Sequence, residues 1–233
     1  MGTDFSGVGR LLANGARARM VDLLLDGRPA TGGELARTAG VSPSTASEHL
    51  GELVRGGLVT ATAQGRHRYY ALTGPRVATA LEALSLICPP TPVRSLRQSA
   101  QARALSQART CYDHLAGVIG VRLLDALLDR AWLTDDVGGY SLTPAGQRAL
   151  QDLGVDVNGA AGRRRNFARP CADWTERRPH LAGALAAAIT ATLLQRQWFQ
   201  RLPTARGLRL TETGRSGVSA HFGITAQALT HRV

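Results

Sequence analysis

Residues 41–72 have the sequence VSPSTASEHLGELVRGGLVTATAQGRHRYYAL, and this stretch decides the fold of the amino-terminal part of the chain. It opens with Ser42 and Pro43, a pair typical of a helix start. Serine caps the first turn, and proline has no amide hydrogen to leave unpaired there. A pair of glycines, Gly56 and Gly57, ends the helix. The stretch therefore predicts one helix from Pro43 to Arg55, followed by extended chain.

A second, shorter helix is expected just upstream. Thr31 and Glu34 have the spacing of a capping box, which predicts a helix over 33–38 that stops at Gly40. Two short helices joined by a tight turn containing glycine form a helix-turn-helix. Before them, apolar residues recur at helical spacing over 8–25, and we expect a single amphipathic helix there.

Two runs typical of β-strands follow the longer helix, over 58–62 and 66–72, and flank a turn that contains glycine. The second run begins with basic residues, where the wing of a winged helix meets the sugar-phosphate backbone of DNA. On the helix, Ala46, Leu50 and Leu53 share the face that must be buried, so the polar side chains project outward toward base edges. The predicted DNA-binding residues are Ser42, Ser44, Thr45, Ser47, Glu48 and His49 on the helix and Arg66, His67, Arg68 and Tyr69 on the wing.

These residues also resemble a known family. The run 41–50, the leucines at 53 and 58, and the motif Gly-Arg-x-Arg-Tyr-Tyr-x-Leu over 65–72 are similar to the winged helix-turn-helix of ArsR-type bacterial repressors. The resemblance implies a homodimer that binds a pseudo-palindromic operator in double-stranded DNA. It also implies a dimer interface that includes the helix after the wing, expected over 77–87. The alternative is a winged helix whose polar residues are merely solvated.

Composition agrees with a nucleic-acid partner. All 28 basic residues are arginine, and the net charge is +11. Residues 1–75 have only 8 arginines and 6 acidic residues, net +2, which weakens the hypothesis of a non-specific architectural DNA binder. No apolar run reaches 18 residues, there is no export signal, and the three cysteines do not fit a disulfide framework. We therefore expect a cytoplasmic protein with no membrane partner.

The remainder of the chain contains an internal repeat. RTCYDHLAG at 109–117 parallels RPCAD at 169–173, followed after six inserted residues by HLAG at 180–183. In both copies an apolar helix, a tryptophan and a Leu-Thr-x-x-Gly motif come next. We expect an α+β, mainly α fold with three parts. They are a winged helix-turn-helix domain over 1–90, a linker with a helix over 91–108, and a duplicated domain over 109–233 made of helix–hairpin–helix pseudo-repeats at 109–157 and 169–226.

The repeat brings a set of metal-binding residue types with it: Cys111, His114, Cys171 and His180. If the copies pack about a pseudo-two-fold axis, two thiolates and two imidazoles would hold zinc or a similar transition metal. Asp113 and Asp173 would then orient the imidazoles. The metal sites usual in ArsR-type repressors look absent, because 33–38 has no Cys or His and 77–87 has neither His nor Asp.

Other interpretations of the same residues stay open. The cysteines and histidines would otherwise serve structural packing, with no cofactor. Asp113 is a good cap for a helix that starts at His114, free cysteine is among the most buried residue types, and a repeated histidine would satisfy a core carbonyl. The two cysteines would otherwise form a thiol redox switch. A small organic effector could bind among the aromatic residues Tyr112, Trp132, Trp174 and Trp198.

The arginine-rich run over 163–169, with Arg177 and Arg178, would contact phosphates or an anionic ligand, but a solvated loop is favoured. A Cys-dependent enzyme is the least favoured interpretation, since the chain lacks a nucleophile elbow, a P-loop and a dinucleotide fingerprint. The sequence thus predicts a DNA-binding transcriptional repressor, not an enzyme, that is released from its operator by an effector sensed in the carboxy-terminal domain.

Overall fold

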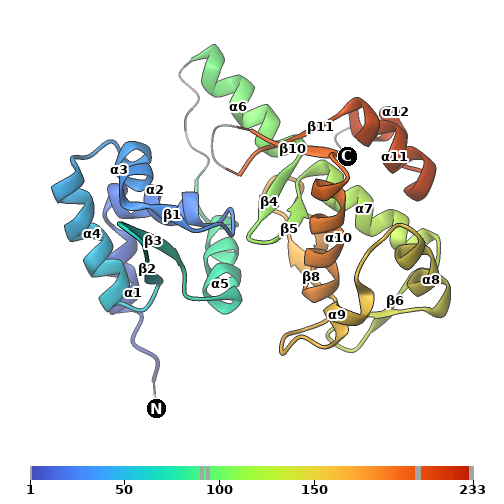
Figure 1. The fold of residues 1–233 in the computed structure, drawn as a ribbon, viewed down its shortest axis with the longest axis horizontal. Helices are drawn as coiled ribbons and strands as arrows, with labels where there is room; N and C mark the ends of the chain where they lie inside the picture. The colour runs from blue at the N-terminus through green and yellow to red at the C-terminus, as the bar shows by residue number, and fades with distance from the viewer. Residues whose placement is uncertain (1, 90–91, 93–94, 203–205, 231–233) are drawn as a thin grey trace. The chain divides into compact units, whose positions relative to one another are not determined.

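The computed structural model describes residues 2–89, 92, 95–202 and 206–230 (Figure 1). Some expected boundaries lie outside these described residues. They are residue 90, where the expected amino-terminal domain ends, residues 231–233, where the expected duplicated domain ends, and positions 91, 93 and 94 of the expected linker. The chain divides into two compact units, Met1–Leu81 and Glu82–Val233. Each unit is described by itself below.

The amino-terminal unit is a winged helix-turn-helix. Its strands form one antiparallel sheet in the order β1-β3-β2: β1 (Ala30–Thr31), β2 (Val59–Gln64) and β3 (His67–Leu72). Its helices are α1 (Ser6–Leu12), α2 (Gly15–Leu24), α3 (Gly32–Ala39), α4 (Pro43–Arg55) and α5 (Pro75–Ser85), the last of which runs across the boundary into the second unit.

Local capping explains where the helix-turn-helix begins and ends. The Thr31 hydroxyl accepts from the Glu34 amide while the Glu34 carboxylate accepts from the Thr31 amide, so α3 starts with the expected capping box. Ser42 caps α4 by accepting from the amide of Thr45 at 3.2 Å. Behind this turn, the buried face of α4 consists of Ala46, Leu50 and Leu53, which pack toward α2 and α3.

The single helix expected over 8–25 is wrong. The structure has two helices there, and Asn14 separates them. The side chain of Asn14 accepts from the amides of Ala16 and Arg17 at 3.0 and 3.2 Å, and its backbone is extended. Asparagine competes with a continuing helix by bonding to nearby amides in this way. A capping interaction therefore overrides the apolar periodicity.

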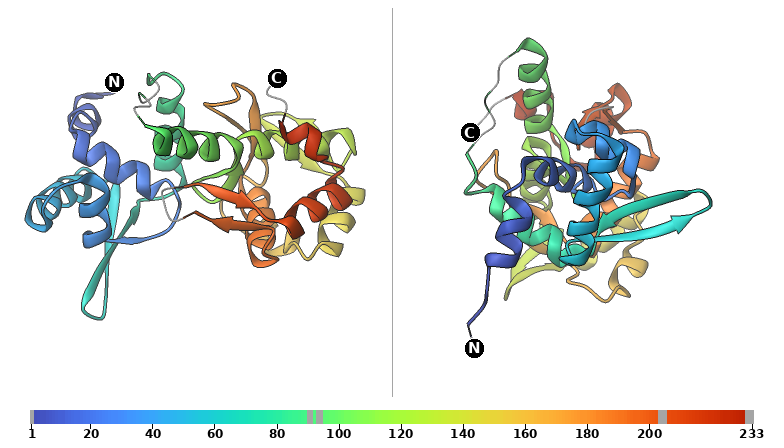
Figure 2. Two further views of the ribbon diagram at one scale, coloured as in Figure 1. Left: turned by 90° about the horizontal axis from the view of Figure 1, so that it is seen from above. Right: turned by 90° about the vertical axis from the view of Figure 1, so that its left-hand side faces the viewer.

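The β2–β3 hairpin forms the wing. Figure 2 shows it as a long ribbon that extends away from the helices of its unit. Strand β2 pairs with β3 from Val59 opposite Leu72 to Gln64 opposite His67. Only Val59 of β2 is buried, so the outer part of the hairpin has its side chains in solvent.

The carboxy-terminal unit repeats one order of elements, hairpin, helix, hairpin, helix. The first series is β4 (Arg109–Cys111), β5 (His114–Ala116), α7 (Val118–Asp129), β6 (Leu133–Asp136), β7 (Gly139–Leu142) and α8 (Pro144–Asp152). The second is β8 (Arg169–Ala172), β9 (Pro179–Ala182), α10 (Ala184–Gln195), β10 (Phe199–Arg201), β11 (Leu208–Leu210) and α11 (Glu212–Phe222). The remaining helices of this unit are α6 (Leu96–Gln107), α9 (Val157–Ala161) and α12 (Ala226–Thr230).

The two series are packed crosswise. Helix α7 contacts β9 of the second series, and helix α10 contacts β5 of the first. Both helices supply much of one apolar core, to which Leu124, Leu127, Leu185 and Ile189 contribute almost fully buried side chains. The crosswise packing places the first hairpin of each series, β4–β5 and β8–β9, against the other, and strands β5 and β9 are in contact.

The expected helix start at His114 is wrong, because His114 is in strand β5, paired with Cys111 of β4. Tyr112 and Asp113 form the turn, and Tyr112 has a φ of 60°. Helix α7 begins only at Val118, after Gly117. Gly117 has a φ of 80°, and a Cβ there would lie 2.6 Å from the carbonyl oxygen of Ser106, so the chain needs glycine at this point. Among the described helices, none is long and apolar enough to cross a membrane.

Candidate functional site

The amino-terminal part of α4 presents a polar face to solvent. Ser42, Ser44, Ser47 and Glu48 are exposed, while Thr45 and His49 are half-buried. The Ser42 hydroxyl lies 2.9 Å from the hydroxyls of both Ser44 and Thr45. All six predicted residues of this helix start therefore have at least part of their side chains accessible. They carry the short donors and acceptors that suit base edges in a major groove.

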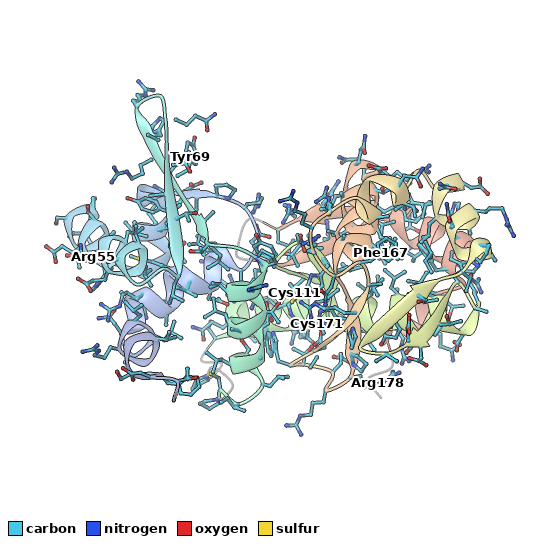
Figure 3. All side chains as sticks on the ribbon, turned by 90° about the horizontal axis from the view of Figure 1, so that it is seen from below. Arg55, Tyr69, Cys111, Phe167, Cys171 and Arg178 are labelled. Carbon is cyan, nitrogen blue, oxygen red and sulfur yellow. The ribbon has the colours of Figure 1, made fainter. Side chains whose placement is uncertain are left out.

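The tip of the wing is basic. Arg66, His67 and Arg68 are exposed, and Tyr69, labelled in Figure 3, is half-buried. The His67 and Tyr69 rings are 6.4 Å apart in an edge-on arrangement. Residues 59–72 include no Asp or Glu, so no carboxylate within the hairpin offsets the two arginines. Such a tip is suited to contact with phosphates.

In the carboxy-terminal unit, the structure brings the four predicted metal ligands together. Cys111 is the cross-strand partner of His114, and Cys171 is the partner of His180. One donor atom from each of the four lies within 4.8 Å of the others, and all four side chains are buried. The Sγ atoms of Cys111 and Cys171, labelled in Figure 3, are 3.8 Å apart. The centroids of the two imidazole rings are 5.1 Å apart.

Each imidazole has a carboxylate beside one of its nitrogens. Nδ1 of His180 lies 3.2 Å from Oδ2 of Asp173, and Nδ1 of His114 lies 3.4 Å from Oδ1 of Asp113. The Nε2 atoms of both rings and Nδ1 of His180 are buried, and none of the three has a hydrogen-bond partner in the part of the chain that the structure describes. A carboxylate beside Nδ1 favours a proton on that nitrogen, which leaves the lone pair of Nε2 free to bind a ligand.

The electrostatics of the cluster favour one thiolate. The hydrogen bond between the two thiols raises the pKa of Cys111, as does burial, and lowers the pKa of Cys171. The neighbouring His114 and His180 rings further lower the pKa of Cys171. Burial alone lowers the pKa of His180, but interactions with Asp173 and Cys171 outweigh burial, and the pKa of His180 is raised. The thiolate is the form of cysteine that binds metals.

Two arginines tie the two halves of the site together. Arg109 of β4 is fully buried, donates to Asp173 at 2.8 Å and lies 4.5 Å from the centroid of the Trp174 ring. Arg165, just before β8, donates to Asp113 at 2.6 Å and to the carbonyl of Gly183 at 3.2 Å. Each aspartate that faces a histidine is therefore held by an arginine from outside its own hairpin.

Sequence reasoning missed these two roles. The signal for Arg109 was its place in the repeated Arg-x-Cys motif, but nothing in the local pattern indicated a buried charge. The sequence predicts a solvated loop around 163–169, but the side chain of Arg165 in this run is only 19% exposed and is paired with Asp113. Similarly, Arg178 donates to Asp125 at 2.7 Å.

The aromatic residues considered as an organic ligand site are not joined into one group. Trp132 is paired with Phe222, Trp198 with His221, and Trp174 with Arg109. Among the described residues, Tyr112, Trp132, Trp174 and Trp198 make no ring contact with one another.

Comparison with known proteins follows the same division of the chain. The family described as "Helix-turn-helix domain" matches residues 12–61. CmtR of Mycobacterium tuberculosis, an HTH-type transcriptional regulator, is 43% identical over 74 residues, 32% of this chain and 62% of CmtR. The homodimeric winged helix-turn-helix DNA-binding domain of Mb0332 from Mycobacterium bovis, "a possible ArsR-family transcriptional regulator", is 30% identical with a TM-score of 0.34. It covers 37% of this chain and 88% of that domain.

The similarity to one relative runs almost from end to end. YdfF of Bacillus subtilis, an uncharacterized HTH-type transcriptional regulator, is 36% identical over 224 residues, which is 96% of this chain and 99% of YdfF. This chain therefore belongs to the HTH-type transcriptional regulators, as the resemblance of its amino-terminal part to the ArsR-type repressors predicts.

Proposed function

We propose that the chain is a repressor that binds a pseudo-palindromic operator as a homodimer. The polar face of α4 carries this proposal: Ser44, Ser47 and Glu48 are exposed on the helix whose opposite face is fixed in the core by Leu50 and Leu53. A helix anchored in this way presents its side chains rigidly to a major groove. Its relatives are transcriptional regulators, and we propose no catalytic role.

The wing supplies the second contact. Arg66 and Arg68 lie on an exposed hairpin without acidic residues, so we assign them to phosphates, with His67 and Tyr69 beside them. Phosphate contacts fix the register of a protein on the duplex, and base contacts fix its sequence preference.

Exposed apolar side chains support the homodimer. Phe5 is 76% exposed just before α1, and Ile87 is 80% exposed just after α5. Val8 on α1 and Leu84 on α5 are also exposed. Within each unit, apolar side chains left in solvent in this way are typical of surfaces that a second copy covers.

The DNA-binding assignment is tested with operators selected by the full-length protein from random duplex DNA. Fluorescence anisotropy then compares a selected duplex with a scrambled one. Ser44→Ala, Thr45→Ala and His49→Ala should each reduce the preference for the selected duplex, since each good base contact contributes about 1–3 kcal/mol of discrimination. Arg66→Ala and Arg68→Ala should lower the affinity for both duplexes by similar factors and reduce the salt dependence of binding.

Arg148→Ala is the matched control, because Arg148 is an exposed arginine on α8 of the other unit. It should leave both affinities and the salt dependence unchanged. The assignment is wrong if the three α4 variants keep the full sequence preference and the two wing variants keep the wild-type salt slope.

We further infer that the Cys111, His114, Cys171 and His180 cluster is a zinc or zinc-like metal site through which the repressor senses an effector. Three observations support the fit. The donor set, two cysteines and two histidines, is a common tetrahedral zinc set. Two thiolates bound to one tetrahedral zinc at about 2.3 Å lie about 3.8 Å apart, and the two Sγ atoms are 3.8 Å apart. Both Nε2 atoms are buried and unpaired within the described chain.

When bound, the metal would supply a link of four ligand bonds between the β4–β5 and β8–β9 hairpins. The residues of the chain prepare the site for it. Asp113 and Asp173 lie beside the imidazoles, and Arg165 and Arg109 hold those aspartates. Because each hairpin contacts the helix that follows the other, a change at the cluster reaches both α7 and α10.

We also propose that the two series of elements are pseudo-repeats of one duplicated unit. Matched contacts support this. The Thr143 hydroxyl donates to the carbonyl of Ala131 at 2.8 Å, and the Thr211 hydroxyl donates to that of Gln197 at 2.8 Å. Ala131 and Gln197 each precede a tryptophan and have φ values of 51° and 59°. A non-glycine residue with positive φ is uncommon, so its recurrence at equivalent positions favours a common origin.

The metal assignment is tested by the metal content of the purified full-length protein, measured by plasma mass spectrometry. We expect about one zinc-like ion per chain in the wild type. Cys111→Ser and Cys171→Ser should lose it, and Cys88→Ser should keep it, because Cys88 is exposed and outside the cluster. Wild-type protein without metal, even after zinc is added, would contradict the assignment. Oxidation that changes DNA binding would then indicate the thiol switch, and no change would indicate structural packing.

A further inference from the structure

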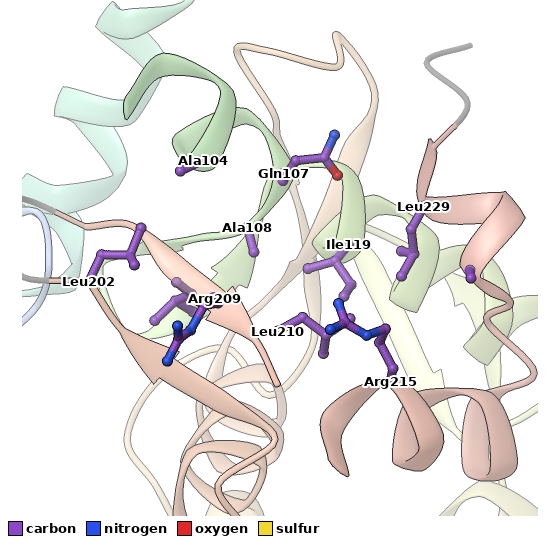
Figure 4. A pocket seen from close by; sticks show the side chains of 11 residues that line it. Ala104, Gln107, Ala108, Ile119, Leu202, Arg209, Leu210, Arg215 and Leu229 are labelled. Carbon is purple, nitrogen blue, oxygen red and sulfur yellow. The ribbon is translucent and has the colours of Figure 1, made fainter. Parts of the chain in front are cut away.

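The carboxy-terminal unit also contains a cavity that the DNA-binding surface and the Cys/His cluster do not use. Its volume is about 600 Å³, within the range of small-molecule sites, and it lies between α6, β11, α11 and α12 (Figure 4). The described residues that line it include no cysteine and no histidine. The cavity is therefore separate in its chemistry from the metal cluster.

The wall of the cavity is mainly aliphatic. Its large apolar side chains come from α7, β11, α12 and the residue after β10, and are those of Ile119, Leu208, Leu210, Leu229 and Leu202. Such a lining favours a ligand with an apolar body, because apolar surface removed from water contributes roughly 25 cal/mol per Å².

The polar groups of the lining are cationic or neutral. Arg209 and Arg215 are among the lining residues, with the amide of Gln107 at the end of α6, and no described lining residue is acidic. The Arg209 contact with Gln200 uses Nη2, and the Arg215 contact with Glu212 uses Nε at 2.9 Å. Neither contact occupies a whole guanidinium, which has five N–H donors and matches a carboxylate in a fork.

We propose that this cavity is a binding site for an amphipathic organic carboxylate, with its apolar body on the aliphatic wall and its carboxylate at Arg209 and Arg215. The positive charges of Arg209 and Arg215 select an anion over a neutral or cationic molecule with the same apolar body. Two arginines among the lining residues, with no acidic residue in the described lining, suit this class of ligand.

The position of the cavity connects it to the metal cluster. Ala108 lines the cavity and precedes Arg109, the first residue of β4. Its carbonyl accepts from the amide of Leu208, another lining residue, at 2.9 Å. Arg109 in turn donates to the carbonyl of Leu105 on α6 at 3.1 Å. If the cavity binds an effector of the repressor, that role rests on the proposed function. The binding of a carboxylate in the cavity does not rest on it.

The test is calorimetric titration of the full-length protein without DNA, so its failure is distinguishable from failure of the repressor proposal. The probes are decanoate and 2-naphthoate, an aliphatic and an aromatic carboxylate, each below its aggregation concentration, with decylammonium as the cationic control. We expect saturable binding of at least one carboxylate at one site per chain, and binding of decylammonium at least tenfold weaker.

Arg209→Gln combined with Arg215→Gln should weaken the carboxylate at least tenfold, and Ala104→Trp, which fills the cavity from α6, should abolish binding. Arg148→Gln, an exposed arginine elsewhere in the unit, should have no effect. Circular dichroism identifies variants that do not fold. If Ala104→Trp is one of them, the double arginine variant and its control Arg148→Gln still test the proposal. Binding of neither carboxylate, equal binding of decylammonium, or wild-type affinity in the double arginine variant would overturn the proposal.

Discussion

Asp173 organises the buried polar groups around the Cys/His cluster. Its carboxylate is fully buried and accepts from Arg109 at 2.8 Å and from the amide of Gly117 at 2.7 Å. It also accepts from the hydroxyl and amide of Thr175. Burial raises the pKa of Asp173, but the interaction with His180 and the charge of Arg109 outweigh burial and hold the pKa well below its usual value. The group is charged because its partners surround it.

Replacement of Asp173 by asparagine should therefore be strongly destabilising. Asp173→Asn leaves the charge of Arg109 buried and unpaired, and breaking a buried ion pair in this way costs about 3–5 kcal/mol. Urea denaturation of the carboxy-terminal transition measures the change. Asp135→Asn, at an exposed position on β6, is the control and should change stability by less than about 0.5 kcal/mol. Equal stabilities of the two variants would show that Asp173 does not hold the site.

At the scale of single elements, the caps of the helix-turn-helix are specified locally. The capping box of α3 and the serine cap of α4 involve residues within three positions of each other. Hydrogen bonds from the amide and hydroxyl of Thr31 lower the pKa of Glu34. These contacts join residues that are close together in the sequence, and they determine where α3 begins.

Thr31→Ala should cost about 1 kcal/mol of stability in the amino-terminal unit. Thr38→Ala, at an exposed position on the same helix, should be neutral or slightly stabilising because alanine has the higher helix propensity. The folded pKa of Glu34 is lowered, so its contribution is present above the unfolded pKa and is lost as pH falls through the folded pKa. Equilibrium unfolding at neutral pH and at pH about 3 should show a smaller difference between Thr31→Ala and wild type in acid.

The hairpin-to-helix turns of the two series offer a second test at this scale. A Cβ added at Gly146 would lie 2.3 Å from the Trp132 carbonyl oxygen, and one at Gly214 would lie 2.1 Å from that of Trp198. Both alanine substitutions should destabilise the carboxy-terminal unit, by about 1–3 kcal/mol each. Gly33→Ala on α3 has no backbone nearby and should stabilise its helix by up to about 1 kcal/mol. Thermal unfolding measures both effects. An unchanged unfolding temperature in either Gly146→Ala or Gly214→Ala would refute the claim that the two turns are equivalent.

These elements show what the sequence could predict and what it could not. Caps, turns and the Cys/His motifs are local or repeated patterns, so the helix-turn-helix, the wing and the four-residue cluster could be predicted. The break at Asn14 and the strand at His114 were missed because a side-chain cap and a cross-strand pairing override helical periodicity. The roles of Arg109 and Arg165 depend on residues more than fifty positions away, which no local pattern encodes.

At the scale of the whole molecule, the chain joins a DNA-reading unit and a larger unit with two prospective ligand sites. The units have separate cores, and the core of the second contains the apolar residues of α7 and α10. A ligand that binds only the folded form stabilises the unit that holds its site, by about 2.7 kcal/mol at a concentration one hundred times its Kd.

Metal removal should therefore act on one unit. Calorimetric scanning of the full chain should show a transition that falls in temperature after treatment with a chelator and recovers with zinc. A transition of the amino-terminal unit should not move. In Cys171→Ser the chelator should have no effect. A chelator-induced shift of the same size in that variant would place the metal elsewhere.

The central claim is that the Cys/His cluster changes how the winged helix-turn-helix binds its operator. The most direct measurement is the Kd for a selected operator duplex, determined with zinc-loaded and with chelator-treated protein, in the wild type and in Cys111→Ser. We predict at least a fivefold difference between the two states of the wild type, as expected of allosteric coupling, and no difference in the variant. A wild-type Kd that is the same in both states, with metal content confirmed in the loaded sample, would contradict the claim.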